Sequence, residues 1–160
     1  MTSLNIEVSI SEQKWTAALL DAPDLCRAAI HGLHDVPSGE VSILLCDDDQ
    51  VRRLNKDYRH QDKPTNVLSF ANDDDTESLD LGTRLLGDIV IAYGVTSREA
   101  QNEGKTLADH LTHLVIHGML HLLGFDHETD AEAERMEDLE ISALARLGIA
   151  DPYSEQTDPS

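Results

Sequence analysis

Three histidines and a glycine in the second half of the chain have the spacing of a metal-binding site. His117 and His121 are four residues apart, so on an α-helix they project from one face, one turn apart, and both can reach one ion. Gly124 can adopt the left-handed backbone conformation that ends a helix and reverses the chain. Such a reversal brings His127 back toward the same face. We therefore predict a single metal ion bound by His117, His121 and His127.

The three predicted ligands favour zinc and a catalytic site. Neutral imidazoles suit Zn²⁺ best among the abundant ions, and three protein ligands leave a fourth position for water. A fourth protein ligand would close the site, but the two cysteines, Cys26 and Cys46, are far away in the sequence. The pattern predicts a hydrolase with one Zn²⁺ per chain.

Three further residues are weaker candidates for contacts that orient the metal ligands. His113 extends the histidine face upstream, where it either packs or hydrogen-bonds to a ligand. Asp88 begins a buried strand after a glycine and either hydrogen-bonds to a metal-binding histidine or caps a loop. Asp126 either orients His127 or fixes the turn. The sequence leaves both interpretations open for each.

A basic cluster lies between residues 52 and 63. Because phosphodiester cleavage builds negative charge on the phosphate oxygens, a guanidinium that binds two of them suits the reaction, and Arg59 is the candidate. Arg52, Arg53 and Lys56 either follow the phosphates of a single strand or form a solvated helix face. Phosphate contacts of this kind carry no base selectivity.

The overall charge opposes a general affinity for polyanions. Twelve Lys+Arg against thirty-one Asp+Glu give a net charge of −19, which repels nucleic acid and anionic membranes at long range. No segment reaches the roughly 18 apolar residues of a membrane span, and the N-terminus lacks the pattern of a signal peptide. We expect a cytoplasmic protein with one metallohydrolase domain over residues 1–160, of which about 151–160 form a frayed tail.

Alternation and helical periodicity predict an α+β fold, in which helices cover one small mixed sheet of about four strands. Strands are expected at 4–10, 40–46, 66–70 and 85–93, and an acidic loop at 72–80. The strand at 40–46 contains the continuous apolar stretch Ile43-Leu44-Leu45, which predicts helices on both of its faces. Helices are expected at 11–33 with a break near Pro23, from 47 to about 58, at 96–102, 106–123 and 130–147.

The spacing H-x-x-x-H-x-x-G-x-x-H resembles the zinc-binding helix of the metzincin peptidases, which implies a zincin-like metal helix. Met136 lies roughly where a methionine would underlie the metal. In those peptidases a glutamate follows the first histidine and takes a proton from water, whereas this chain has Gly118. A peptidase would need another carboxylate as its base.

With glycine at that position, the run VIHGMLHLLGFDH resembles the signature of the YbeY family of bacterial endoribonucleases. The similarity extends over roughly residues 40–153 and keeps its order and spacing. Besides the histidine run it includes Tyr58-Arg59, the segment PTNVLSF at 64–70, the segment LGDI at 86–89 and the acidic last helix. The family often has proline where this chain has Ala71.

The resemblance implies a zinc-dependent endoribonuclease that acts on single-stranded RNA, matures the 3′ end of small-subunit ribosomal RNA and serves ribosome quality control. It makes His117, His121 and His127 the metal ligands and Arg59 the catalytic or substrate-binding cation. The expected partners are ribosomal RNA and the ribosome or its proteins, which would help an acidic enzyme meet its substrate, and neither DNA nor a membrane. Two alternatives remain open: a metzincin-like peptidase, and a non-enzymatic ribosome-assembly factor with structural zinc.

Overall fold

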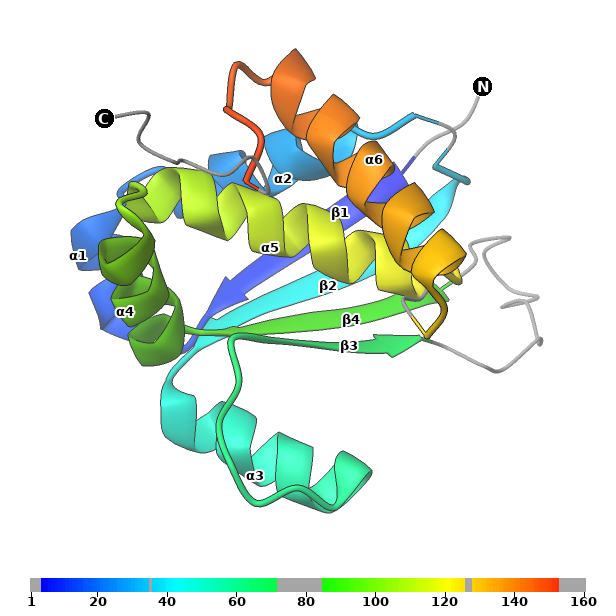
Figure 1. The fold of residues 1–160 in the computed structure, drawn as a ribbon. Coiled ribbons are helices and arrows are strands. Elements are labelled where there is room, and N and C mark those ends of the chain that lie inside the picture. Colours follow the sequence, from blue (N-terminus) through cyan, green and yellow to red (C-terminus); the bar gives the residue numbers. More distant parts are fainter. Residues whose placement is uncertain (1–3, 35, 72–84, 126–127, 153–160) are drawn as a thin grey trace.

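The computed structural model describes residues 4–34, 36–71, 85–125 and 128–152. Its centre is a four-stranded sheet with the order β1-β2-β4-β3 (Figure 1). The predicted α+β class and the mixed sheet are confirmed. Strands β1 (Leu4–Ile10), β2 (Gly39–Cys46) and β4 (Leu85–Ala92) are parallel, and β3 (Val67–Ala71) runs antiparallel to β4. The antiparallel strand therefore forms one edge of the sheet.

Most helices lie on one side of the sheet (Figure 1). Helices α2 (Ala22–His31) and α5 (Leu107–Leu122) pack on that face, and α6 (Asp130–Arg146) packs on α5. The short α1 (Gln13–Ala18) and α4 (Tyr93–Glu103) lie toward one end. Side chains cap the starts of α5 and α6. Thr106 accepts a hydrogen bond from the Asp109 amide, and Thr129 and Glu132 form a capping box.

Helix α3 (Asp48–Arg59) is the one described helix on the opposite face of the sheet. Asp47 caps its start by accepting a hydrogen bond from the Gln50 amide, and His60 ends it in the left-handed conformation at φ 58°. Within the sheet this helix packs mainly on β3 and β4, and it also contacts α4. Side chains of β2 consequently alternate between buried and half-buried, so the predicted cover on both faces of that strand is incomplete.

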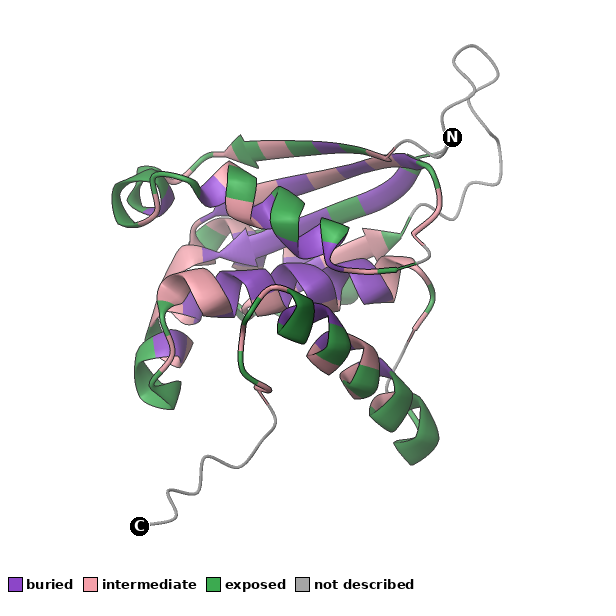
Figure 2. Cartoon of the chain, turned by 90° about the horizontal axis from the view of Figure 1, so that it is seen from above, coloured by how far each residue is buried: buried purple, intermediate pink, exposed green. Residues whose placement is uncertain are grey.

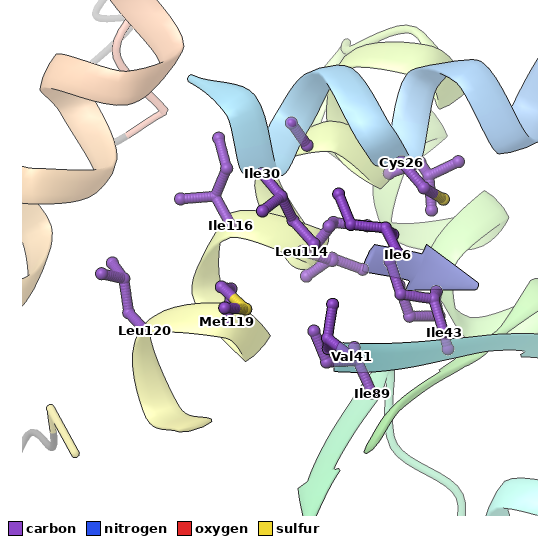
Figure 3. Close-up of a cluster of buried hydrophobic side chains, with 14 of the residues drawn as sticks. Ile6, Cys26, Ile30, Val41, Ile43, Ile89, Leu114, Ile116, Met119 and Leu120 are labelled. Atoms are coloured by element: carbon purple, nitrogen blue, oxygen red, sulfur yellow. The ribbon is translucent and has the colours of Figure 1, made fainter. Parts of the chain in front are cut away.

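The main hydrophobic core lies between the sheet and the α2–α5 layer (Figure 3). Alternate residues of β2 and β4 point into it because successive strand residues face opposite sides. Figure 2 shows buried residues concentrated in the sheet and in the helix along it, with the outer sides of the other helices exposed. Fully buried members include Ile43, Leu45, Ile89, Ile91, Leu111, Ile116 and Met119.

The predicted break near Pro23 is present, because α1 ends at Ala18 and α2 begins at Ala22. Pro23 itself lies in the first turn of α2, where a missing amide hydrogen costs nothing. The start of helix α4 differs from the prediction, because the helix begins at Tyr93, directly after β4, and not at residue 96. The acidic loop at 72–80 and residues 153–160 of the predicted tail lie outside the described residues. Among the helices of the described part, none combines the length and apolar character needed to cross a bilayer.

Candidate metal and phosphodiester site

Helix α5 presents two of the predicted ligands at one point in space. The Nε2 atoms of His117 and His121 are 3.1 Å apart, and both rings are partly buried. One ion can bind both nitrogens at this separation, because zinc binds imidazole nitrogen at about 2.0–2.1 Å. The predicted convergence of this pair is therefore present in the structure.

The turn that ends α5 orients the His121 ring. Gly124 has φ +101°, a conformation that side chains rarely adopt, and its amide donates to the His121 carbonyl. The chain then returns so that the Phe125 carbonyl lies 3.1 Å from His121 Nδ1. A carbonyl only accepts, so Nδ1 carries the hydrogen and the lone pair of a neutral ring is on Nε2.

The His117 ring is oriented by another helix. Glu140 of α6 places Oε2 2.8 Å from His117 Nδ1. A carboxylate accepts here as well, which again leaves the lone pair on Nε2. The two Nε2 lone pairs then point toward the same place, where a metal ion can bind both of them. The donor set consequently fits the zinc ion expected from the sequence.

The remaining predicted ligand cannot be placed. His127 and Asp126 lie outside the described residues. Within the described ranges no group of three or more His, Cys, Asp or Glu side chains is arranged to hold a metal. The three-histidine site therefore remains a prediction, of which the structure supplies two members.

Glu140 is the site residue that the sequence reasoning missed. Its side chain is 1% exposed and contacts two histidines, since Oε1 also lies 2.7 Å from His113 Nε2. His113 and His117 thus share the Glu140 carboxylate, and their rings also meet edge to face with centroids 6.4 Å apart. A signal was present in the sequence, because Glu140 is four residues from both Met136 and Leu144 and so falls on the apolar side of the last helix.

A second histidine–carboxylate pair lies further along α5. His110 is 4% exposed, and its Nε2 is 2.9 Å from Glu99 Oε1 on α4. The same Glu99 oxygen accepts a hydrogen bond from the Asn66 amide group at 3.0 Å. This pair joins α4, α5 and the segment before β3. The buried position of His110 is therefore explained by this contact between helices.

Arg59 is held at the edge of the cavity that contains the histidines. One of its nitrogens, Nη2, donates to the Ser69 carbonyl at 2.7 Å, and the guanidinium lies 5.5 Å from the centroid of the Phe70 ring. Arg59 comes from the last turn of α3, on the far side of β3 from α5. The sequence placed Arg59 and the histidines 58 residues apart or more, and the fold brings them to one hollow.

This hollow has a volume of about 620 Å³. Its size is that of a site for a small molecule or a short piece of a flexible chain. The strand β3 forms one wall and the end of α5 another. The described residues that line it are Arg59, Thr65, Asn66, Val67, Leu68, Ser69, Ala71, His117, His121, Gly124 and Phe125.

The other basic residues of α3 are directed elsewhere. Arg52 forms ion pairs with Asp49 at 2.9 Å and Asp62 at 2.6 Å, and Arg53 pairs with Asp49 at 2.8 Å. The hydrogen bond from Arg52 lowers the pKa of the Asp49 carboxyl, so that carboxyl is ionised at neutral pH. Lys56 is exposed, and it is not among the described residues that line the hollow. The structure does not bring these three predicted substrate contacts to the histidines.

Asp88 does not support the metal ligands either. In β4, Gly87 and Ile89 face α5, so the intervening Asp88 projects from the opposite face of the sheet. There it lines a separate hollow with Tyr58, Leu54 and other residues of the α3 side. Partial burial at that place raises the pKa of its carboxyl. Of the two possibilities left open for Asp88, a hydrogen bond to a metal-binding histidine does not fit this position, because strand alternation puts the side chain on the other face of the sheet.

Gly118 is required for the close approach of α5 to the sheet. A Cβ at this position would lie 2.9 Å from Ile89 Cγ2 and 3.1 Å from Ser69 Oγ. The Ser69 hydroxyl donates to the Gly118 carbonyl at 3.0 Å. The position faces the sheet at van der Waals distance, so a glutamate in the manner of the metzincins does not fit the observed packing. This geometry weakens the peptidase alternative.

Comparison with known proteins assigns a family to this combination of fold and site. Residues 3–148 match the family model described as Endoribonuclease YbeY. Relatives named Endoribonuclease YbeY include one from Paramagnetospirillum magneticum, 49% identical over 96% of this chain and 98% of the relative. Another, from Rhizorhabdus wittichii, is 60% identical over 72% of this chain and 71% of its own. The solution structure of a Thermotoga maritima protein is similar in fold, with a TM-score of 0.52 and 24% identity over 97% of this chain and 98% of that chain.

Proposed function

Because the chain belongs to the Endoribonuclease YbeY family, we propose that it hydrolyses phosphodiester bonds of single-stranded RNA in a zinc-dependent reaction. The observation that carries the proposal is the shared hollow: a guanidinium from α3 and two converging imidazoles from α5 line the same 620 Å³ space. These are a charge that can bind phosphate and a donor pair that can hold a metal. Neither the histidine spacing nor the fold by itself requires the guanidinium and the imidazoles to line the same space.

His117 and His121 would hold the zinc ion, with His127 as the third ligand expected from the sequence pattern. When bound, zinc supplies a Lewis acid for the phosphate and favours the ionisation of water near neutral pH. The protein's part is to fix the two rings so that both Nε2 lone pairs point inward. The Phe125 carbonyl and the Glu140 carboxylate do this by accepting the hydrogens on the opposite ring nitrogens.

Arg59 would stabilise the charge that develops on the phosphate. Its guanidinium has five N–H donors, and the Ser69 carbonyl engages one nitrogen, which leaves the others for two phosphate oxygens at once. The contact with the Phe70 ring and the hydrogen bond to Ser69 restrict the side chain before substrate arrives. A restrained donor stabilises a transition state without a further ordering cost.

The size of the hollow supports a single-stranded substrate. About 620 Å³ accommodates a nucleotide-sized part of a flexible strand rather than a duplex. We further propose ribosomal RNA as the substrate and small-subunit 3′-end maturation, with ribosome quality control, as the role. The net charge of −19 repels free RNA at long range, which supports presentation of the substrate by the ribosome or a ribosomal protein in the cytoplasm.

Cleavage of matched substrates tests the proposed activity. Purified protein and its Arg59→Ala variant are incubated with a single-stranded RNA, with the same RNA as a duplex, and with an unstructured protein. We expect cleavage of the single strand by the wild-type protein only. Equal RNA cleavage by both proteins would reject the role of Arg59, and cleavage of the protein substrate alone would favour a peptidase. Ribosome binding without any cleavage would favour the assembly factor with structural zinc.

A further inference from the structure

Glu140 is a buried carboxylate in an otherwise apolar stripe of α6. Among the described residues of this helix, the other buried ones are Met136, Ala143 and Leu144. Glu140 as a whole residue is 0% exposed. Transfer of an unpaired carboxylate to such a place costs several kcal/mol, about as much as a whole domain can spare. A carboxylate is retained there only with compensating contacts, and apolar residues would pack at lower cost.

The contacts that compensate Glu140 divide its two oxygens between two turns of α5. Oε1 lies 2.7 Å from His113 Nε2, and Oε2 lies 2.8 Å from His117 Nδ1. The two rings are four residues apart, so they are neighbours on one helix face. Each ring therefore restrains one end of the carboxylate. The plane of the carboxylate cannot rotate toward one ring without losing the other.

This geometry has a consequence for the protonation pattern of His117. A neutral imidazole carries one hydrogen, and its position is set by the stronger acceptor nearby. With Glu140 accepting at Nδ1, the hydrogen stays there and the lone pair stays on Nε2, 3.1 Å from His121 Nε2. Without that acceptor the ring could place its hydrogen on Nε2 and turn about its own bonds.

We propose that Glu140 is a positioning residue that fixes the Nδ1–H tautomer and the orientation of His117, and that His113 acts on His117 through Glu140. The inference deepens the proposed function, because an oriented His117 matters most if it binds a metal. The tautomer itself requires neither zinc nor RNA. A purely structural role, in which the carboxylate only fastens α6 to α5, predicts a stability change but no change in tautomer.

Glu140→Met tests the proposal, because methionine has a similar length and removes both acceptor oxygens. The matched control is Glu134→Met, the same change at an exposed position of the same helix. Two quantities are measured. The His117 tautomer is read in the metal-free protein from ¹H–¹⁵N correlations across the ring, and the Zn²⁺ dissociation constant from competition with a chromophoric chelator. Glu140→Asp, which keeps the charge but shortens the side chain, replaces the methionine variant if that variant does not fold.

We expect wild-type protein and Glu134→Met to show His117 as the Nδ1–H tautomer, and Glu140→Met to show a substantial Nε2–H population. The Zn²⁺ dissociation constant of Glu140→Met should rise about 10- to 100-fold, the usual effect of losing a partner of a metal-binding histidine. His113→Phe should weaken zinc binding less, and its effect should vanish in the Glu140→Met background, because residues that act through one another are not additive.

A folded Glu140→Met protein with an unchanged His117 tautomer would overturn the proposal, as would equal effects of His113→Phe with and without Glu140. Failure of the proposed function has a different signature. If wild-type protein takes up no zinc and cleaves no RNA, the enzymatic assignment fails, while the tautomer comparison in the metal-free protein still decides whether Glu140 positions His117.

Discussion

The histidines of α5 and the arginines of α3 lie on helices with different surroundings. His117 and His121 direct their Nδ1 atoms at acceptors inside the protein, so their Nε2 atoms converge on one point. Arg52 and Arg53 instead direct their guanidiniums at Asp49 on the surface, away from the hollow. Helical spacing brings His117 and His121 to one face, but a position on a helix does not by itself direct a side chain into a site. A face becomes a site where buried partners on other elements orient its side chains.

Arg59 marks the boundary between these two regions. It belongs to the basic helix, yet it is held by the backbone of β3 and by the Phe70 ring, as the histidines are held by α6 and the turn after α5. Its position at the end of α3 brings it past the edge strand. The comparison therefore predicts a gradient: histidine substitutions should have the largest effect, Arg59 a smaller one, and the other arginines almost none.

The largest effect is expected for His121→Ala. Removal of a ligand should weaken Zn²⁺ binding by more than about 100-fold, since loss of a ligand's hydrogen-bond partner alone costs about 10- to 100-fold. RNA cleavage should fall in parallel. Metal content after gel filtration and cleavage rate measure the two quantities. His31→Ala, at an exposed helical histidine, is the control, and a His121→Ala protein that keeps stoichiometric zinc would place the metal elsewhere.

Arg59→Ala should lower kcat/KM for RNA cleavage by about 10²- to 10³-fold, the size of the loss when a positioned transition-state donor is removed. Zinc binding should be unchanged, because Arg59 contacts the Ser69 carbonyl and not the histidines. Arg59→Lys keeps the charge but not the paired donors, so it should recover only part of the loss. Full activity of Arg59→Lys would show that the reaction needs only a positive charge at this position and not the paired donors of arginine.

Gly118→Ala tests whether the distance between α5 and the sheet is as tight as it is in the structure. The added methyl group meets Ile89 at 2.9 Å, and overpacking of this kind typically costs about 1–3 kcal/mol of unfolding free energy. Denaturant unfolding of the metal-free protein measures it. Ser142→Ala on the exposed side of α6 should stay within about 0.5 kcal/mol. An unchanged stability for Gly118→Ala would show that α5 can move away from the sheet freely.

The smallest effect is expected for Arg53→Gln. Its ion pair with Asp49 is exposed, and exposed pairs contribute little to stability because solvent screens them. RNA cleavage should change less than about twofold, because the side chain does not reach the hollow and surface charges are screened at physiological salt. A loss of RNA cleavage comparable with that of Arg59→Ala would indicate that the basic residues of α3 contact the substrate.

Residues whose function depends on local chain geometry could be predicted from the sequence. The pairing of His117 with His121 follows from helical spacing, and the left-handed Gly124 follows from the need to end a helix before the chain reverses. The four strands and the class of the fold follow from alternation. In each of these cases neighbouring residues carry the information.

Residues whose role depends on a distant element were not predictable in this way. Glu140 contacts histidines 23 and 27 residues away, and only its place in an apolar stripe distinguishes it from the other acidic residues of α6. For Asp88 the sequence left a histidine contact open, because alternation alone does not tell which face of the sheet a strand residue occupies, and the structure places it on the face away from α5. The meeting of Arg59 with the histidines required the order of the strands.

Zinc reconstitution of RNA cleavage tests the central claim most directly. Protein stripped with a chelator, and shown by elemental analysis to be metal-free, is titrated with Zn²⁺ while the cleavage rate of a single-stranded RNA is measured. Activity should be absent at the start and should rise to a plateau at one equivalent of zinc per chain. Full cleavage by the verified metal-free protein would contradict the account, because the converging imidazoles of α5 would then have no part in the reaction.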